Sequence, residues 1–469
     1  MDAEAGTPAV GLALIVRDEE GQLPVLLASI EGAFDQVVLV DTGSKDRTVE
    51  VFREWAAAQG VAHKVGEFEW VDDFAAARNF ADSLLDTEWK CWADADDVLR
   101  GAENLRQLAA EAPPQLSGYL AGYDYAQDQH GNSVCYLKRE RLIRRTASEW
   151  VGRVHEAQIV AGTVTELPPQ VCEWVHRKSA EGGPQRNLRI LRKWLRDEPQ
   201  NPRVLSYLGT EEAARAKHKR AIGYFRRYLK LKTGWDEERA QVHRKLAASL
   251  LATERPSEAL TVGLEAFRVL PSWPDSYLTL AQASYSLGRH ADAIFWAERV
   301  LELGHPDTLL IVNPLDYTVQ PQVVLAAAHG ALGNTDTAIE YARAVLATVP
   351  DHAELARHAA GWESVSMREA VANTFCGSAE LLVRHDEQLA ALELLERTVP
   401  HFAKDHPKVV ALRSALRERL AWLCDPDAYA RHYEEGGSKP EDFVSDPEEA
   451  CSRLPRAQFL LEGLAEQAA

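Results

Sequence analysis

Apolar and polar positions follow two different patterns along the chain, and the change falls near residue 180. Before that point, strand patterns alternate with helical ones. A short, continuous apolar run is typical of a strand that is buried on both faces. These patterns predict four strands, which are Val10–Val16, Gln36–Val40, His63–Phe68 and Trp89–Ala93.

The segments between these strands predict helices at Leu23–Ile30, Asp46–Ala58 and Phe74–Leu85, with Asp46 as the N-cap of the second. Strands that alternate with helices form a mostly parallel sheet with helices on both faces. Ligands of such sheets bind just beyond the carboxyl ends of the strands. Asp41 and Asp94 stand at two of these ends, so both are candidate ligand contacts.

After Pro114 the pattern becomes that of a mixed sheet. Two β-rich segments flank the turn sequence QHGN and predict a hairpin. Two further strands are expected before residue 180, in the same domain. The four predicted strands are Gly118–Tyr125, Ser133–Lys138, Gln158–Val164 and Gln170–His176.

From about Gln185 the chain has only helical patterns, and an alanine followed by isoleucine or leucine recurs in a shared context. The four alanines are Ala221, Ala259, Ala293 and Ala338, with spacings of 38, 34 and 45 residues. Helix–turn–helix units with a period near 34 residues resemble tetratricopeptide repeats. Small residues at such positions let paired helices pack closely. A generic helical bundle is the alternative, and the longest spacing predicts an insertion at Gly304–Gln320.

These patterns divide the chain into four predicted parts. Residues 1–180 form an α/β domain, and 181–350 form the helical repeats. Residues 351–424 add further hairpins, with helices expected at Ser378–Val399 and Lys408–Leu423. The acidic residues 425–469 are a tail or a cap.

Composition narrows the class of protein. Of 469 residues, 46% are hydrophobic and 26% charged, which excludes a disordered, collagen-like or membrane-embedded chain. The apolar run Val10–Val16 is too short to span a membrane, and no basic segment precedes it as in a secretory signal. The six cysteines stand singly, as is usual for reduced thiols. We therefore expect a soluble cytoplasmic protein that does not engage a membrane.

The net charge of −19 argues against binding to nucleic acid. The charge is uneven, because Arg177–Lys232 contains 16 lysines and arginines against 5 acidic residues. These cations either face solvent and dock on the acidic first domain, or steer an acidic acceptor towards it. In the second case Lys217, Lys219 and Arg220 are the residues to reverse.

The sequence WKCWADADD contains the sharpest chemical signal. A predicted strand delivers Asp94, Asp96 and Asp97 into a turn at its carboxyl end. Carboxylates this close repel one another unless a cation or a hydrogen-bond donor offsets their charge. Oxygen ligands favour Mg²⁺ or Mn²⁺, which also bind phosphate. A capping cluster at a helix start is the alternative.

Two other polar positions share this edge of the predicted sheet. Asp41 ends the second strand in the sequence DTGS, where a glycine gives the backbone freedom near a ligand. Arg78 lies in the helix before the aspartate cluster, and its planar guanidinium suits a base or a phosphate. Arg78 could instead pair with Asp72 or Asp73 at the start of its own helix.

The segments VGLALIVRDEE, VVLVDTGSKDRT, FAAARNFA and WADADD together resemble the nucleotide-sugar half of a family 2 glycosyltransferase with the GT-A fold. The subgroup with C-terminal tetratricopeptide repeats, which includes sublancin-type peptide S-glycosyltransferases, is the most similar. The resemblance covers about residues 8–178, and the repeats extend it to about 350. It implies a GT-A domain, a Rossmann-like mixed sheet, followed by an all-α solenoid.

The resemblance also implies roles for single residues. Val16 and Arg17 line the base pocket, and Asp41 holds the base. Arg78 contacts the base or the diphosphate, Asp94 the ribose, and Asp96 the metal ion, Mn²⁺ or Mg²⁺.

The segment Trp150–Glu156 resembles the acceptor side of this family. Glu156 is then the first candidate for the general base and His155 the second. Glu156 could instead form a structural ion pair with Arg153 or Arg145. Trp150 and Asp97 are possible sugar or acceptor contacts, and Trp150 could instead fill the core. His176 ends the last predicted strand, where the family often has a further metal ligand, or else it is a structural histidine at the domain junction.

The expected function is a metal-dependent, inverting glycosyltransferase with a nucleotide-sugar donor, which we expect to be UDP-linked. The repeats favour a protein or peptide acceptor, bound in part by the solenoid, over a glycan or lipopolysaccharide-type acceptor. A nucleotidyltransferase is disfavoured, because the first strand lacks a glycine-rich basic loop after it. A non-catalytic repeat scaffold is the alternative of another class, and the intact Asp41, Arg78, Asp94 and Asp96 argue against it.

Overall fold

The structure is a computed structural model that describes residues 9–177, 183–384 and 388–424. Contacts group the residues up to Leu332, with Ala344–Pro350, into one compact unit. Gly333–Arg343 and the residues from Asp351 form a second unit. The four-part division expected from the sequence stays a prediction, and residues 425–469 lie outside the described part. No helix in the described ranges is both long and apolar enough to cross a bilayer.

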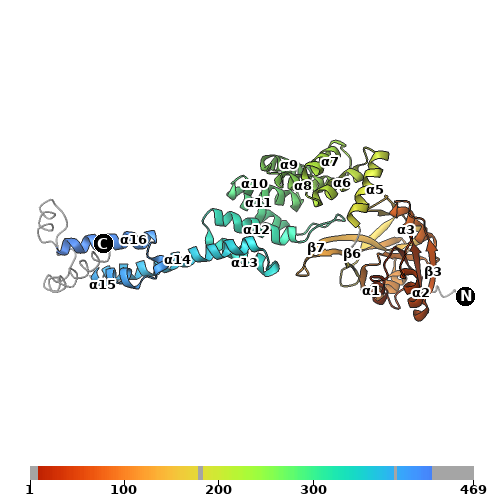
Figure 1. Cartoon of the computed structure of the whole chain (residues 1–469), viewed down its shortest axis with the longest axis horizontal. Helices are drawn as coiled ribbons and strands as arrows, with labels where there is room; N and C mark the ends of the chain where they lie inside the picture. Colours follow the sequence, from red (N-terminus) through yellow and green to blue (C-terminus); the bar gives the residue numbers. More distant parts are fainter. Residues whose placement is uncertain (1–8, 178–182, 385–387, 425–469) are drawn as a thin grey trace. The chain divides into compact units, whose positions relative to one another are not determined.

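A nine-stranded mixed sheet forms the N-terminal part of the first unit (Figure 1). The strands β3 (Ala62–Glu67), β2 (Gln36–Asp41), β1 (Val10–Val16) and β4 (Trp89–Ala93) are parallel neighbours in that order. The four strands predicted from the apolar runs are therefore confirmed. Their carboxyl ends lie at one edge, which brings the residues after β1, β2 and β4 together.

The hairpin predicted after Pro114 is also present and extends the sheet. β7 (Ser133–Arg144) pairs antiparallel with both β4 and β6 (Leu116–Gln127). β6 then pairs along its other edge with β10 (Thr163–Glu166) and β11 (Glu173–His176). β11 pairs with β5 (Asp97–Arg100) in antiparallel register, which sets His176 opposite Asp97.

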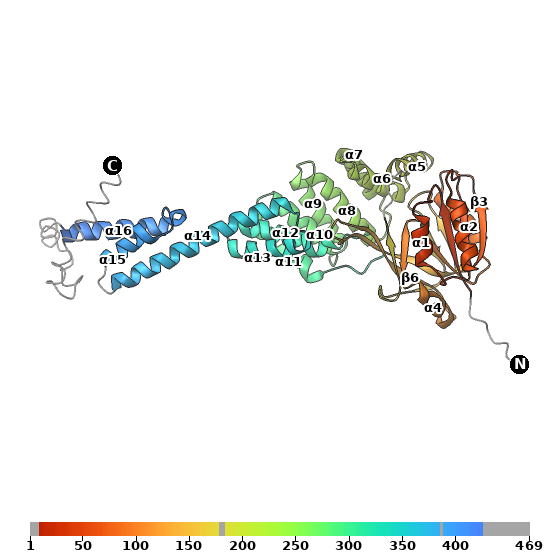
Figure 2. The ribbon, with the colours of Figure 1, turned by 60° about the horizontal axis from the view of Figure 1, so that its bottom comes forward.

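Alternating side chains of the parallel strands enter two cores. Leu12 and Leu14 of β1 pack with α1 (Leu23–Ser29), α2 (Thr48–Gln59) and α4 (Leu105–Glu111). Ala13 of β1 packs on the opposite face with residues of α3 (Phe74–Ser83). Figure 2 shows α1 and α2 against the strands, and the contacts of α3 on the opposite face complete a sheet covered by helices on both faces.

Two predictions in this part were wrong in detail. The helix after β2 begins at Thr48, and the Asp46 carboxylate accepts the Thr48 backbone N–H at 3.0 Å from two residues earlier. The strand expected at Gln158–Val164 is two strands, because Gly162 turns the chain with a φ of +105°. The first, β9 (Ala157–Val160), pairs with β8 (Ser148–Val151) in a separate ribbon, and the second is β10.

The solenoid of the first unit is built from helical hairpins that follow α5 (Gly183–Asp197). The alanines that mark the repeat are all fully buried, so small side chains do sit where the helices pack. Gly209 shows the same close approach, because a Cβ there would lie 2.3 Å from Phe225 of the next helix. The hairpins are α6 (Pro202–Ala214) with α7 (His218–Lys230), α8 (Asp236–Leu251) with α9 (Pro256–Val269), and α10 (Pro274–Ser286) with α11 (His290–Leu303). α12 (Leu315–Ala331) follows in the same unit, whereas α13 (Thr335–Thr348) is divided between the two units.

The predicted insertion contains residues 304–314, which we call the strap and which tie the solenoid to the sheet. The insertion ends earlier than predicted, because α12 begins at Leu315 and includes Pro321. Within the strap, the Val312 backbone forms an antiparallel bridge with Tyr136 of β7, with N···O distances of 2.8 and 2.9 Å. Lys138 of β7 also forms an ion pair of 2.6 Å with Asp307. The strap is therefore a strand-like extension of the sheet.

In the second unit, the described residues of the helix expected at Ser378–Val399 are helical up to Thr398, but its predicted start was wrong. α14 (Ala353–Arg384) starts much earlier, and α15 (Gln388–Glu393) is a separate element. Few side chains of α14 are buried, so its sequence lacks the apolar stripe by which an amphipathic helix is recognised. The last helix is α16 (Pro407–Cys424), close to the predicted Lys408–Leu423.

Candidate functional site

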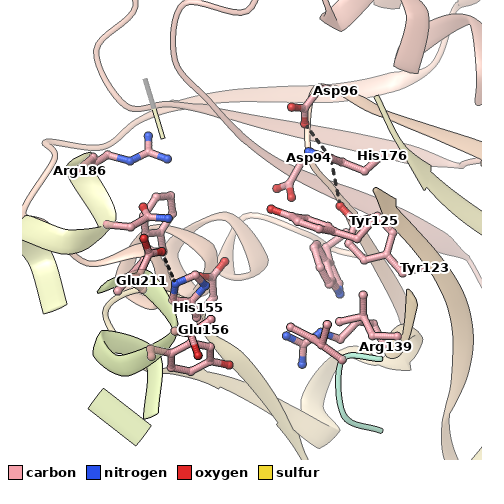
Figure 3. Close-up of a pocket in the computed structure, with 18 of the residues that line it drawn as sticks. Asp94, Asp96, Tyr123, Tyr125, Arg139, His155, Glu156, His176, Arg186 and Glu211 are labelled. Carbon is pink, nitrogen blue, oxygen red and sulfur yellow. Dashed lines mark hydrogen bonds and ion pairs between the residues drawn. The ribbon is translucent and has the colours of Figure 1, made fainter. Parts of the chain in front are cut away.

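A cavity of about 1060 Å³ opens at the carboxyl ends of the parallel strands and continues along the solenoid, all within the first unit. Its first part lies against the residues that follow β1 and β4. Its second part lies against the first helix of each hairpin. Figure 3 shows Asp94, Asp96 and His176 on one side of this cavity, with Arg186, His155 and Glu211 on the other.

Arg78 of α3 organises the floor of the cavity and is 5% exposed. Its guanidinium packs against the rings of Trp92 and Trp150, at 4.5 and 4.9 Å from their centroids, and the two rings also contact each other. It donates to Asp94 Oδ1 and to Glu156 Oε1, each at 2.7 Å. Burial alone would raise the pKa of Asp94, but the Arg78 charge and hydrogen bond bring it below its usual range. Arg78 thus holds Asp94 ionised and keeps both carboxylates in place.

The pairing of Arg78 differs from the alternative considered from the sequence. Asp73 caps α3 by accepting the Ala76 backbone N–H at 3.0 Å. Asp72 pairs through both oxygens with Arg189 of α5, at 2.6 and 2.8 Å. Both aspartates are therefore occupied elsewhere.

A carboxylate–imidazole cluster forms where β4 and β11 end. Asp96, Asp97 and His176 each present a possible ligand atom within 4.8 Å of the others. The Nδ1 atom of His176 lies 3.1 Å from Asp97 Oδ1 and 3.4 Å from Asp96 Oδ1. The ring of Tyr125 stacks on the His176 imidazole with centroids 4.6 Å apart, which fixes its plane.

Asp97 is the buried member of this cluster, with 1% of its surface exposed. Its Oδ1 accepts from the Tyr123 hydroxyl at 2.7 Å, and its Oδ2 accepts from the Asp94 backbone N–H at 3.0 Å. Beneath it lies the fully buried Arg141, which donates to the Trp92 carbonyl at 3.0 Å. With both oxygens engaged, Asp97 is suited to orient His176 rather than to bind a ligand itself.

Two acidic side chains that face the cavity, Asp96 and Glu19, have raised pKa values. Burial, and then the charges of Asp94 and Asp97, raise the pKa of Asp96 to about 6. Burial, and then the charges of Asp96 and Asp94, raise the pKa of Glu19 to about 7. A cation bound here would relieve this repulsion, so the charge pattern fits a divalent metal ion. Glu19 was not singled out from the sequence, although it lies in the segment VGLALIVRDEE that carries the resemblance.

The other residues predicted for the site lie in three different settings. Val16 and Arg17 line the cavity. Asp41 is half-buried beside it, where its carboxylate accepts from the backbone N–H and hydroxyl of Ser44 at 3.0 and 2.6 Å. Trp150 is 5% exposed and does not line the cavity; its indole N–H donates to Asp82 at 3.0 Å. Trp150 and Asp97 thus support the residues that line the cavity from below.

His155 lies at the point where the sheet and the solenoid meet. Its backbone has a φ of +52°, which is unusual outside glycine. The imidazole stacks on Tyr207 of α6 with centroids 4.2 Å apart, and its Nε2 lies 3.5 Å from Glu211 Oε1. Arg215 holds Glu211 with an ion pair of 2.6 Å. Tyr207 and Glu211 come from a repeat helix, so no motif near His155 in the sequence could have revealed them.

The solenoid part of the cavity, which we call the acceptor arm, is lined by successive repeats in a regular way. Its helical lining residues all lie on the first helix of a hairpin, the side of such repeats that forms the inner surface of a solenoid. The strap and β7 complete the walls. The lining residues of the acceptor arm are Tyr207, Thr210 and Glu211 on α6, Gln241, Arg244 and Lys245 on α8, Asp275 on α10, Asp316 on α12, Ile311, Val312 and Asn313 on the strap, and Val134, Leu137 and Arg139 on β7.

Comparison with known proteins agrees with this architecture. Residues 13–134 match the family model described as Glycosyl transferase family 2, so the chain contains a domain of that family. The chain is similar to a TPR repeat-containing protein of Synechococcus elongatus, with 28% identity over 223 residues, which cover 44% of this chain and 52% of that protein. It is also similar to the SPbeta prophage-derived glycosyltransferase SunS of Bacillus subtilis, with 24% identity over 236 residues, which cover 48% and 54%.

The chain therefore spans about half the length of these curated relatives. Among solved structures, a thermophilic TPR protein of Thermus thermophilus aligns over 38% of this chain and 90% of its own, at 18% identity and a TM-score of 0.31. The family match and the two relatives confirm the resemblance to a family 2 glycosyltransferase with tetratricopeptide repeats.

Proposed function

We propose that this protein is an inverting glycosyltransferase that moves a sugar from a nucleotide-sugar donor, UDP-linked, to a side chain of a polypeptide. The observation that carries the proposal is the cavity itself. It joins an acidic cluster at the carboxyl ends of the strands to an arm built from repeat helices. A donor site and an acceptor site that share one cavity are what a transfer reaction needs, because the two reactants must meet in one geometry.

The donor half of the cavity supports the binding of a nucleotide. Val16 and Arg17 lie where a base would enter, at the end of β1. Asp94 is held ionised by Arg78 and is suited to accept hydrogen bonds from ribose hydroxyls. Arg186 of α5 extends over the Phe74 ring into the same half, where its charge interacts with those of Asp94 and Glu19. We assign Arg186 to the diphosphate; Asp41 is kept as a base contact on the resemblance alone.

The cluster at β11 supports a role in holding Mn²⁺ or Mg²⁺. If the Nδ1–H of His176 donates to Asp97, then Nε2 keeps its lone pair and becomes a ligand. Asp96 supplies a carboxylate oxygen from the facing turn. A metal ion bound there would neutralise the charge that develops on the leaving diphosphate. In this account Asp96 and His176 are the ligands, while Asp97 positions His176 from the core.

The arrangement favours His155 over Glu156 as the general base. Glu156 was the first candidate, but one of its oxygens is committed to Arg78. This hydrogen bond of 2.7 Å holds the Glu156 carboxylate towards Arg78. His155 lines the cavity, and its Nε2 faces Glu211, which leaves Nδ1 to accept the proton of the attacking group. The Glu211 carboxylate would then stabilise the imidazolium that forms.

The direct test is to incubate the full chain with Mn²⁺, a panel of nucleotide sugars and a set of peptides with cysteine, serine or threonine centres. Mass spectrometry should show a peptide carrying one added hexose or related sugar, and release of the nucleoside diphosphate. Release of the diphosphate with sugar on an oligosaccharide, and never on a peptide, would assign a glycan acceptor instead. No diphosphate release with any donor would contradict the proposed function.

A further inference from the structure

Two cations in the acceptor arm have no acidic partner among the described residues, which is unusual in a lining otherwise made of paired charges. Arg244 pairs with Asp275 at 2.7 Å and also with Asp316. Glu211 is paired with Arg215. Arg139 and Lys245, by contrast, have no hydrogen bond or ion pair from their side chains to any described residue. Both line the cavity.

These two cations lie on facing walls of the arm. Arg139 is on β7, two residues from Leu137, and both side chains line the cavity from the same face of the strand. Figure 3 shows Arg139 among the side chains that border the cavity. Lys245 is on α8 and lies near Cys135, a further two residues along the same face of β7. A ligand that enters between β7 and α8 therefore meets positive charge on both sides.

The surroundings of Lys245 make the lack of a partner costly. Burial, and then repulsion from Arg244, lower the pKa of Lys245 to about 8. The other charged or titratable groups around it are Glu238 on its own helix, Asp275 on α10 and Cys135 on β7, and Arg244 already takes Asp275. An anion that binds in the arm would stabilise the protonated amine.

We propose that the acceptor arm binds a polypeptide segment that carries a carboxylate beside the residue to be glycosylated, and that Arg139 and Lys245 hold this carboxylate. The inference rests on the proposed function and names its acceptor class. A carboxylate fits because its two oxygens accept hydrogen bonds from guanidinium and amine groups. A peptide fits because the arm also offers the amide of Gln241, the hydroxyl of Thr210 and the edge of the strap, whereas its aromatic ring, Tyr207, is already covered by His155.

The basic residues of the acceptor arm differ from Lys217, Lys219 and Arg220, which the sequence suggested. Lys217 and Lys219 are exposed, and neither they nor Arg220 line the cavity. Other cations of the basic stretch dock the solenoid on the first domain, as Arg189 does with Asp72 and as Arg203 does by donating to the His155 carbonyl. Further cations of the stretch pair within the solenoid, as Arg215 does with Glu211 and Arg226 with Glu258. The acceptor charge is therefore assigned to Arg139 and Lys245.

The test measures peptide binding to the full chain by fluorescence polarisation, without a donor. Two pools of eight-residue peptides share a central serine or cysteine; flanking positions are alanine, glycine, aspartate and glutamate in one, and alanine, glycine, asparagine and glutamine in the other. We expect the acidic pool to bind at least about tenfold more tightly, ~1.4 kcal/mol. Raised salt should reduce the difference. Pools with free and amidated C-termini separate side-chain carboxylates from a terminal one.

Matched variants decide whether the two cations are responsible. Arg139→Gln with Lys245→Gln should abolish the preference for the acidic pool, whereas the control Lys217→Gln with Lys219→Gln should keep it. The conservative pair Arg139→Lys and Lys245→Arg should retain most of it. In the native chain the preference should shrink as the pH rises through about 8, because Lys245 loses its charge, and Lys245→Arg should remove that dependence.

Three outcomes would overturn the proposal. The first is equal binding of the acidic and neutral pools by the native chain. The second is an acidic preference that survives in the Arg139→Gln/Lys245→Gln variant. The third is that polygalacturonate oligosaccharides bind the arm while neither peptide pool does. UDP binding, measured in parallel, reports on the donor half alone, so failure of the acceptor assignment is distinguishable from failure of the proposed function.

Discussion

Replacing His155 with glutamine is expected to slow sugar transfer by about 10²–10⁴-fold, the range for loss of a general base. Glutamine keeps the size and polarity of the side chain but cannot accept the proton of the acceptor. The His155 ring does not hold the nucleotide half of the site, so UDP affinity should remain unchanged. Steady-state kinetics with a peptide acceptor should therefore show the loss in kcat, with KM for the donor close to that of the native chain.

Glu156→Gln is the matched comparison, because it differs in what it disturbs. Glu156→Gln weakens the ion pair with Arg78, and Arg78 also holds Asp94 in the donor half. Donor affinity should therefore fall together with the rate. If Glu156→Gln instead lowers kcat alone and His155→Gln transfers sugar at near the native rate, then Glu156 is the base. Glu211→Gln adds a second check, because it should shift the acidic limb of the pH–rate profile while His155 is still present.

The second large effect is on stability, and it concerns Arg78. Arg78→Met should lower the free energy of unfolding by about 3–5 kcal/mol, because it leaves the Asp94 and Glu156 carboxylates without their shared buried partner. Urea unfolding followed by tryptophan fluorescence is a suitable measurement, since Trp92 and Trp150 flank the guanidinium. The double variant Arg78→Met/Glu156→Gln should recover part of the loss.

Arg100→Met is the control for this comparison. Arg100 pairs with Glu173 at 3.1 Å, but its side chain is 63% exposed. An exposed ion pair of this kind contributes at most about 1 kcal/mol. Similar losses of unfolding free energy in the Arg78 and Arg100 variants would show that the buried network stabilises the fold no more than an exposed ion pair does.

The sequence predicted the sheet and the repeats because both follow from local patterns. The apolar runs of β1, β2 and β4 fix which segments are buried strands, and the sheet rule then places the residues that follow them at one edge. The repeated alanines, such as Ala221 and Ala259, revealed the helix pairs because close packing leaves no room for larger side chains there. Both are properties of single segments and their spacing.

What the sequence did not reveal depends on partners that are far apart along the chain. Glu156 was considered as a partner of Arg145 or Arg153, which are close in sequence. In the structure Arg145 donates to the Thr87 carbonyl and Arg153 pairs with Asp197, whereas Glu156 pairs with Arg78, 78 residues away. The pairing exists because β8 packs beside α3, and no local pattern encodes that contact.

The solenoid side of the site was hidden for the same reason. Glu211 and Lys245 stand on repeat helices at positions that any exposed helix face would tolerate as charged residues. They line the cavity because the strap pairs with β7 at Val312 and holds the solenoid against the sheet. The insertion was visible in the repeat spacing, but its pairing with Tyr136 was not.

If Asp96 and His176 hold a divalent cation, donor binding should depend on that cation. Calorimetric titration of the full chain with UDP, in the presence of Mn²⁺ and again with a chelator, measures this dependence. We expect UDP affinity to fall by at least about tenfold without the metal, and Asp96→Asn to show the weak affinity under both conditions. Equal UDP affinity with and without Mn²⁺ in the native chain would contradict it.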